Sequence, residues 1–477
     1  MGKVEPKVTL QVLWQSEDSI RVTPFKEGSA LESTVKTSRT CPFHSGLVAD
    51  RATEILSLLA RANSGDDGLL DQLVAAGRAI YVDLLPAFLK EKLREARGKS
   101  LVLHLDRQLV GIPWELLHDG DDFLGRAHRI GRLVSTEGDG TPPLQRNMQP
   151  PLSALVVADP AGDLPGARAE AAEVEAILEE APFCGGVTVL TGKVGLRSFR
   201  DELARHDILH FAGHADPDPL TGEAHLRLAD GKLPVSLIEQ WRGRVDVPGL
   251  VFLNACASAD AAHQMSWSGG QQAGRGGSDR GTGGRASGLA SALLQAGVRH
   301  VVGTLWAVRD EVARRFATRF YRALSAGDSI GTAMAAGRDD VAAAWGEESL
   351  LWADHLLYGD PTWRVETPGN LTFADLDVLD GLQDKYRAEL VSTDGATRLL
   401  AAAMLLRLGD RGAIGALAKE LPLLESWMAN DAPRQQRRQA ALVVQALASA
   451  AGLAPSEPPD DLPDMAAVRG FVERLRS

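Results

Sequence analysis

The sequence predicts an α/β protein with a mostly parallel sheet covered by helices, an N-terminal α+β subdomain and a C-terminal helical domain. Between residues 150 and 366, short apolar runs alternate with helical patterns, which is typical of parallel strands linked by helices. After about residue 369 the apolar residues follow helical spacing only. A chain of 477 residues with 44% hydrophobic content is long enough for two or three domains. We place them at 1–145, 150–366 and 369–477.

The N-terminal region begins with a predicted β-hairpin. Val8 to Trp14 alternate with polar residues, and Ile20 and Val22 follow before a break at Pro24. Apolar stripes predict helices over 52–59 and 80–89, and residues 101–105 predict a strand. Residues 145–151 form a proline-bearing linker.

The central region predicts the sheet itself. Its strands are expected at 155–157 and 187–190, in the runs that begin at 208 and 250, and at 298–305. Its helices are expected at 167–180, 196–203, 289–294 and 312–324. The runs at 208 and 250 end at His214 and Cys256, which would therefore lie where strands give way to loops, the usual ligand site of open sheets.

His214 and Cys256 are the candidate catalytic residues. A free thiol has a pKa near ~8.5 and needs a base to form the attacking thiolate at neutral pH. An imidazole can supply that base even when it is distant in sequence. The alternative is that Cys256 is a small buried hydrophobic residue.

The chain resembles CHAT-domain proteins of the caspase-like cysteine peptidase clan, which also includes caspases, metacaspases and separase. The resemblance covers roughly residues 101–365. It rests on six landmarks in the family's order: Gly111–Leu117 (GIPWELL), Ala158–Pro160 with Asp163–Ala167 and Glu170, the His214 segment, the Cys256 segment, Gly303–Trp306 (GTLW) and Leu357–Pro361 (LYGDP).

This resemblance implies a caspase-like three-layer α/β/α sandwich and a cysteine endopeptidase that needs no cofactor. By position, Cys256 matches the nucleophile and His214 the general base, and backbone N–H groups of Gly213, Ala215 and Cys256 would hold the oxyanion. The family usually has glycine after the histidine, whereas this chain has Ala215, which adopts positive φ less readily. The resemblance also suggests that the N-terminal subdomain is packed against the catalytic one and could be a degenerate copy of it.

The resemblance also suggests a biological role. Prokaryotic relatives often serve defence or programmed-death systems and cut a partner such as a gasdermin-like pore former once an upstream activator or sensor triggers them. The competing hypothesis is a non-catalytic CHAT scaffold that only binds protein partners.

Residues 266–288 form an insertion in which nine of 23 residues are glycine, which predicts a mobile segment. It is either a tolerated surface insertion or an activation linker with self-cleavage candidates at Arg275, Arg280 and Arg285. Three nearby acidic residues could favour an Arg or Lys side chain at the cleaved bond. They are Asp216, Asp218 and Asp260, and the alternative is that they are ordinary solvated loop aspartates. Related enzymes with basic specificity often carry an acid two residues before the cysteine, where this chain has Asn254.

Composition excludes several other functions. A net charge of −12 argues against nucleic-acid binding. The three cysteines have no CxxC spacing, so neither a zinc site nor a disulfide framework is expected, which implies a reducing cytoplasm. No run approaches ~18 apolar residues, so no membrane segment is expected. His210 and His214 would form a metal-binding HxxxH only on a helix, and Asp207 is a conceivable orienting partner of His214 that we do not count as a third catalytic residue.

The C-terminal region predicts further helices at 371–391, 399–408, 413–421 and 437–451. The middle two, separated by Gly409 and Asp410, resemble one unit of a HEAT-type repeat. A small bundle or short solenoid of this kind either binds a protein partner or packs against the catalytic domain.

Overall fold

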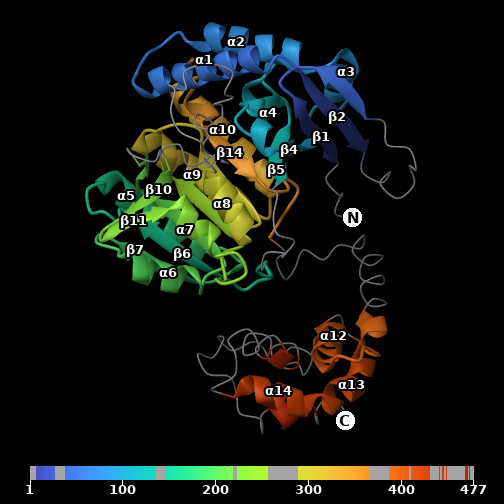
Figure 1. Cartoon of the computed structure of the whole chain (residues 1–477). Helices are drawn as coiled ribbons and strands as arrows, with labels where there is room; N and C mark the ends of the chain where they lie inside the picture. The colour runs from blue at the N-terminus through green and yellow to red at the C-terminus, as the bar shows by residue number, and fades with distance from the viewer. Residues whose placement is uncertain are drawn as a thin grey trace, which may run out of the picture. The chain divides into compact units, whose positions relative to one another are not determined.

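The computed structural model describes residues 7–26, 38–135, 145–218, 223–255, 288–365, 386–407 and 410–429, together with 440, 443, 444, 447, 468–470 and 472 (Figure 1). The chain divides into two compact units, one of Val4–Asn370 and one that contains Leu371–Ser477. The first unit holds the sheet and the candidate site.

The centre of the first unit is an eleven-stranded sheet with the order β3-β2-β1-β4-β5-β14-β13-β12-β8-β6-β7. Its strands are β1 (Lys7–Ser16), β2 (Ser19–Lys26), β3 (Arg39–Pro42), β4 (Ser100–Asp106), β5 (Arg129–Ser135), β6 (Leu152–Ala158), β7 (Cys184–Thr191), β8 (Ile208–Ala212), β12 (Leu250–Asn254), β13 (His300–Thr304) and β14 (His355–Tyr358). A separate sheet, β11-β10-β9, consists of β9 (Ala215–Pro217), β10 (Ala224–Leu228) and β11 (Gly231–Pro234).

The large sheet contains two groups of parallel strands that run in opposite directions, and β2 is antiparallel to its neighbours β1 and β3. Strands β7, β6, β8, β12 and β13 are mutually parallel, and β1, β4, β5 and β14 are parallel to one another. The direction reverses between β13 and β14, which pair in antiparallel fashion. The amide of Gly359 donates to the carbonyl of Arg132 at 2.8 Å, which joins β14 to β5. The two halves therefore share one hydrogen-bonded sheet.

Helices cover both faces of the second half. The connection β6–α5–β7 runs in one direction along the sheet, and the connections that contain α6 and α8 run in the other, so right-handed crossovers place α5 opposite α6 and α8. Consistently, α5 packs on α9 and α9 on α10, whereas α8 packs on α7. These helices are α5 (Pro165–Glu179), α6 (Leu196–Leu203), α7 (Val235–Glu239), α8 (Leu289–Ala296), α9 (Asp310–Ser325) and α10 (Ile330–Trp345). The mostly parallel α/β class expected from the sequence is confirmed.

The N-terminal helices are α1 (Ser45–Asn63), α2 (Leu70–Leu84), α3 (Ala87–Glu95) and the short α4 (Leu124–Ala127), and α1 and α2 lie side by side (Figure 1). The apolar stripe over 80–89 had predicted one helix, which is wrong. Pro86 follows an extended Leu85 and starts α3, because proline disfavours a helical residue before it. Short 3₁₀ turns complete the first unit at Arg107–Leu109, Trp114–Leu116, Glu347–Ser349 and Leu351–Ala353.

The hairpin of β1 and β2 is confirmed, but β2 does not break at Pro24. Strand β2 continues to Lys26 and pairs Pro24 with Leu10. Strand β3 pairs with β2 only from Ser19 to Val22, so beyond Val22 strand β2 has one neighbour, β1. Pro24 lies in this part of β2, where a residue without a backbone N–H is tolerated.

The second unit is helical where it is described. It contains α12 (Gly395–Arg407), a 3₁₀ turn (Arg411–Ala413), α13 (Ile414–Lys419) and α14 (Leu421–Met428). The helix expected over 413–421 corresponds to α13, which ends at Lys419, and α14 begins at Leu421 with Pro422 in its first turn. Most of the helices expected at 371–391 and 437–451 lie outside the described residues.

Within the described ranges, no single helix is both long and apolar enough to cross a membrane. Only the pair α2 and α3, bent by 118°, meets the length and composition criteria together.

Candidate active site

The candidate site lies at the carboxyl ends of β6, β8, β12 and β13. Strands β8 and β12 are parallel neighbours, and Ala212 at the end of β8 pairs with Asn254 at the end of β12. The backbone N–H of Gly213 donates to the Asn254 carbonyl at 3.1 Å. His214 follows Ala212 by two residues, just as Cys256 follows Asn254 by two in the sequence. Cys256 itself lies outside the described residues.

His214 is directed toward a carboxylate. Its side chain is 24% exposed, and its Nε2 lies 3.0 Å from Oδ1 of Asp163. Because a carboxylate only accepts hydrogen bonds, this contact requires a proton on Nε2, and in the neutral form of the ring the lone pair is on Nδ1. Asp163 is half exposed and lies 3.5 Å from the Arg227 guanidinium.

The loop after β6 is folded so that it brings Asp163 to this position. Asp159 adopts a positive φ of 49°, and its buried carboxylate accepts from the Leu164 N–H at 2.8 Å and from Arg168 Nε at 2.7 Å. Burial raises the pKa of Asp159, but these hydrogen bonds outweigh it and hold the pKa below its ordinary value. The Asp159–Asp163 segment was a family landmark in the sequence, although spacing alone assigned no role to Asp163.

Asp207, considered as an orienting partner, lies at the opposite end of β8. Its Oδ2 accepts from the backbone N–H and the hydroxyl of Ser153, both at 2.8 Å, and its Oδ1 lies 3.3 Å from Nη1 of Arg146. The interpretation of Asp207 as a possible partner of His214 is therefore wrong, because the whole length of β8 separates them.

A cavity of about 100 Å³ lies beside His214, between the strand ends and the start of α9. Its described lining includes buried Glu170, Asn254 and Thr304, and Asp310 from the first turn of α9. Burial raises the pKa of Asp310, and the negative charge of Glu170 raises it further, while His214 lowers it. The cavity therefore carries an acidic wall next to the imidazole.

His210 does not form a metal site with His214. It is fully buried in β8, and its Nε2 lies 2.9 Å from Oε1 of Glu170. Among the residues that the structure describes, no group of three or more His, Cys, Asp or Glu side chains is arranged to hold a metal ion.

Two of the three residues expected to bind the oxyanion, Gly213 and Ala215, lie within the described residues, and their backbone N–H groups have different surroundings. The N–H of Gly213 is already bonded to Asn254. Ala215 starts β9 without a positive φ, so alanine is compatible with this backbone. The Arg227 N–H donates to the His214 carbonyl at 3.0 Å, so these two residues form a hydrogen-bonded pair. Hydrogen-bonded and non-hydrogen-bonded pairs alternate along an antiparallel ladder, and the next pair is Ala215 with Leu226. The N–H of Ala215 therefore points away from β10.

The acidic residues expected to line a specificity pocket face cations of this chain. Asp216 Oδ2 lies 3.7 Å from Arg227 Nε, and Asp218 Oδ2 lies 3.0 Å from Lys232 Nζ. Asp260 and the self-cleavage candidates Arg275, Arg280 and Arg285 lie outside the described residues, as does the insertion apart from Gly288.

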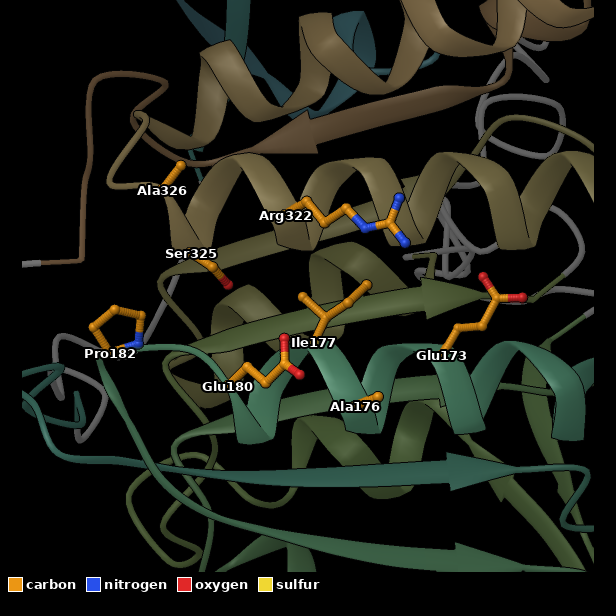
Figure 2. A pocket seen from close by; sticks show the side chains of 8 residues that line it. All are labelled: Glu173, Ala176, Ile177, Glu180, Pro182, Arg322, Ser325 and Ala326. Atoms are coloured by element: carbon orange, nitrogen blue, oxygen red, sulfur yellow. The ribbon is translucent and has the colours of Figure 1, made fainter.

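A larger groove of about 480 Å³ lies between the second half of α5 and the end of α9 (Figure 2). It contains none of the residues that the sequence predicted for catalysis. The residues that line it are Glu173, Ala176, Ile177, Glu180, Pro182, Arg322, Ser325 and Ala326. Because α5 starts beside His214 and runs away from it, this groove is separate from the candidate site.

Two other sequence landmarks have structural roles. In the GIPWELL segment, Trp114 Nε1 donates to the Leu109 carbonyl at 3.0 Å, and buried Glu115 accepts from Nε of buried Arg132 at 3.0 Å. In the LYGDP segment, Asp360 accepts from Lys7 at 3.0 Å, which ties β1 to the end of β14. These landmarks stabilise the fold away from His214.

Comparisons with known proteins place this chain in a family. The family model described as the CHAT domain matches residues 74–360. Similar solved structures include the Arg-specific cysteine proteinase gingipain R (RgpB), with 14% identity over 59% of this chain and 67% of that chain and a TM-score of 0.43. The complex of Porphyromonas gingivalis RgpB pro- and mature domains gives 13% identity, 59% and 69% coverage and a TM-score of 0.41.

The separase of Saccharomyces cerevisiae, solved in complex with securin, matches at 11% identity over 75% of this chain with a TM-score of 0.44. The match spans 30% of the separase chain. No curated protein sequence matches this chain significantly. The family model covers more than half of the 477 residues, which confirms the resemblance stated from the sequence. The chain belongs to the CHAT-domain family.

Proposed function

We propose that this chain is a cysteine endopeptidase that uses a dyad of His214 and Cys256. The observation that carries the proposal is the parallel pairing of β8 and β12, with Ala212 opposite Asn254. Both candidate residues follow this pair by two positions in the sequence, and the carboxyl ends of parallel strands form one edge of the sheet. The cavity beside His214 supplies a concave surface at the same edge.

In this proposal, Nδ1 of His214 accepts the proton of the Cys256 thiol, and the thiolate attacks the carbonyl carbon of a peptide bond. The contact with Asp163 orients the ring and keeps the other proton on Nε2. The backbone N–H groups of Ala215 and Cys256 hold the oxyanion. The imidazolium then protonates the leaving amine, and water releases the acyl group from the sulfur. No cofactor takes part.

Oxyanion binding by Ala215 is supported by the direction of its N–H, away from β10. Gly213 contributes differently, because its N–H is bonded to Asn254 and holds the histidine loop against β12. A side chain at Gly213 would meet the Phe211 ring at 2.9 Å and Pro160 at 3.0 Å, so glycine allows this close approach.

The proposal is tested with a thiol-reactive peptidyl probe on the full chain. Wild type is expected to be labelled at Cys256, identified by peptide mass spectrometry, and His214→Ala is expected to lose the labelling. Thermal unfolding of both proteins controls for folding. Equal labelling of wild type and His214→Ala would contradict the dyad, whereas a folded, unlabelled wild type would favour the non-catalytic CHAT scaffold.

For the biological role, we propose cleavage of a partner protein in the cytoplasm of a prokaryote, within a defence or programmed-death system. A gasdermin-like pore former is the proposed substrate, and an upstream activator the proposed trigger. The support is the family resemblance alone. Incubation of the purified protein with candidate partners encoded by neighbouring genes, with Cys256→Ala as control, tests it by the appearance of a cleaved product.

Activation by self-cleavage within residues 266–288, after Arg275, Arg280 or Arg285, completes the proposal. Intact-mass measurement of wild type and Cys256→Ala tests this step. Cleavage outside the insertion, or an equal pattern in both proteins, would exclude it. Fluorogenic peptides with Arg, Lys or Leu before the scissile bond would then show whether Asp216, Asp218 and Asp260 select basic residues.

A further inference from the structure

We infer that Asn254 is a positioning residue that holds the segment leading to Cys256 in register with the His214 loop. The inference rests on the proposed function and assigns a role that neither the family match nor the dyad supplies. Asn254 is the last residue of β12, it is 8% exposed, and it precedes Cys256 by two positions. Its carbonyl accepts from the Gly213 N–H, one residue before His214.

The side-chain amide of Asn254 is bonded to three other elements. Its Oδ1 accepts from Nε2 of His355 in β14 at 3.1 Å. Its Nδ2 donates to the Ala313 carbonyl in α9 at 3.2 Å and to the Glu170 carboxylate in α5. An amide offers two donor hydrogens and one acceptor oxygen, so both its ends are held in one orientation. The end of β12 is therefore fixed to both neighbouring helices and to β14.

His355 is a neutral hydrogen-bond donor in this network. Burial, together with the charge of Arg338, lowers its pKa to about 3. Its ring is stacked on Phe316 with centroids 3.7 Å apart and an interplanar angle of 3°. Since the side-chain oxygen Oδ1 of Asn254 accepts this bond, the ring proton of His355 lies on Nε2. The bond therefore persists throughout the pH range in which the thiol titrates.

This arrangement distinguishes Asn254 from a specificity residue. Asn254 borders the cavity, but its polar atoms are turned to His355, Ala313 and Glu170. An aspartate at this position would bring a second carboxylate against buried Glu170 and could not donate to Ala313, so the network selects asparagine on electrostatic grounds. Thr304 adds support one residue later, because its hydroxyl donates to the Ala255 carbonyl at 2.7 Å.

The test measures the pKa of the Cys256 thiol and does not depend on peptidase activity. The full chain is alkylated with iodoacetamide between pH 5 and 9.5, and mass spectrometry follows the rate on the Cys256 peptide. If His214 holds the thiolate, wild type reacts with an apparent pKa below the ~8.5 of a free thiol. Asn254→Ala is expected to shift that pKa toward ~8.5, with alkylation at pH 6 slowed about tenfold if the pKa rises by about one unit.

Two variants of His355 keep the test decisive if Asn254→Ala fails to fold. His355→Phe keeps a ring on Phe316 but loses the donor, and is expected to shift the thiol pKa in the same direction. His355→Gln retains a donor at the Nε position and is expected to restore part of the wild-type profile. His300→Phe is the matched control, because His300 is also buried but lies at the opposite end of the neighbouring strand, stacked on Trp363.

The outcomes separate this inference from the proposed function. An unchanged profile in His214→Ala would overturn the dyad and with it the inference. A shift in His214→Ala with wild-type profiles in Asn254→Ala and His355→Phe would overturn the inference alone. Equal shifts in His355→Gln and His355→Phe, or an equal shift in His300→Phe, would also overturn it, because packing and not the hydrogen bond would then control the thiol.

Discussion

Asp354 predicts an unusual pH dependence of stability. It lies just before β14 and is fully buried, and its Oδ2 accepts from Nδ2 of Asn63, the last residue of α1, at 3.0 Å. The Oδ1 atoms of Asp354 and Asn63 are both buried, and neither has a partner within the described part of the chain. Burial raises the pKa of Asp354 to about 7, although the Asn63 bond lowers it. The folded protein therefore favours the neutral acid.

The sign and size of the effect follow from this pKa. An unfolded aspartate titrates near 3.8, so between pH 3.8 and about 7 the folded state binds more protons than the unfolded state. The free energy of unfolding therefore falls as the pH rises through this window and levels off above it. At about 1.4 kcal/mol per pH unit, Asp354 costs up to about 3 kcal/mol between pH 5 and 7. In Asp354→Asn this dependence is absent.

The assay is urea unfolding of wild type and Asp354→Asn at pH 5 and pH 8. The free energy of unfolding of the variant, relative to wild type, should rise by about 3 kcal/mol from pH 5 to pH 8. Asp360→Asn is the control, and its effect on the free energy of unfolding should be the same at pH 5 and pH 8, because this carboxylate is ionised in both the folded and the unfolded state over that range. Burial raises the pKa of Asp360, but bonds from Thr362 and Lys7 outweigh it and hold the pKa below its ordinary value. Parallel curves for wild type and Asp354→Asn, within about 1 kcal/mol, would refute the reasoning.

Three further substitutions test other parts of the structure. Glu115→Gln leaves the Arg132 guanidinium buried without a counter-charge and should lower the free energy of unfolding by about 3 kcal/mol in urea titrations. Asp163→Asn should reduce kcat about tenfold with little change in KM, because Asp163 orients His214 and does not contact the substrate in the proposed mechanism. The expected loss is smaller than the ~10⁴-fold fall in kcat that follows loss of a buried orienting aspartate, because Asp163 is half exposed. Gly213→Ala should reduce the rate of Cys256 labelling while unfolding stays cooperative, since its methyl group would displace the His214 loop from Phe211. Wild-type behaviour in any of these assays would contradict the corresponding contact.

The sequence predicted the second half of the sheet well because each of its strands is a short apolar run. Buried parallel strands such as β8 and β12 are continuous apolar runs, and their short length and their alternation with helical patterns identify them as strands. Strand β14 and helix α10 were missed. The four residues of β14 are too short for a pattern, and α10 is rich in alanine and glycine, which gives a weak apolar stripe.

For the site, the sequence identified the strand ends and His214 but not the groups that act on the imidazole. Asp163 is 51 residues before His214, and only the folded loop after β6 brings the two together. Likewise, no local pattern indicates that Asn254 contacts His355 a hundred residues later, because such contacts depend on the order of strands. The roles of Asp163 and Asn254 therefore required the structure.

The shared ladder of β5 and β14 has a consequence for truncation. A fragment that begins at residue 150 would lack β5, and with it the pairing of Tyr358 with Arg132, so this side of the apolar strand β14 would become an exposed edge of the sheet. It would also leave the ring of Tyr358 without the Arg132 guanidinium, which lies 5.8 Å from the ring centroid. We expect such a fragment to self-associate through β14, so residues 150–365 should not be stable as an isolated fragment.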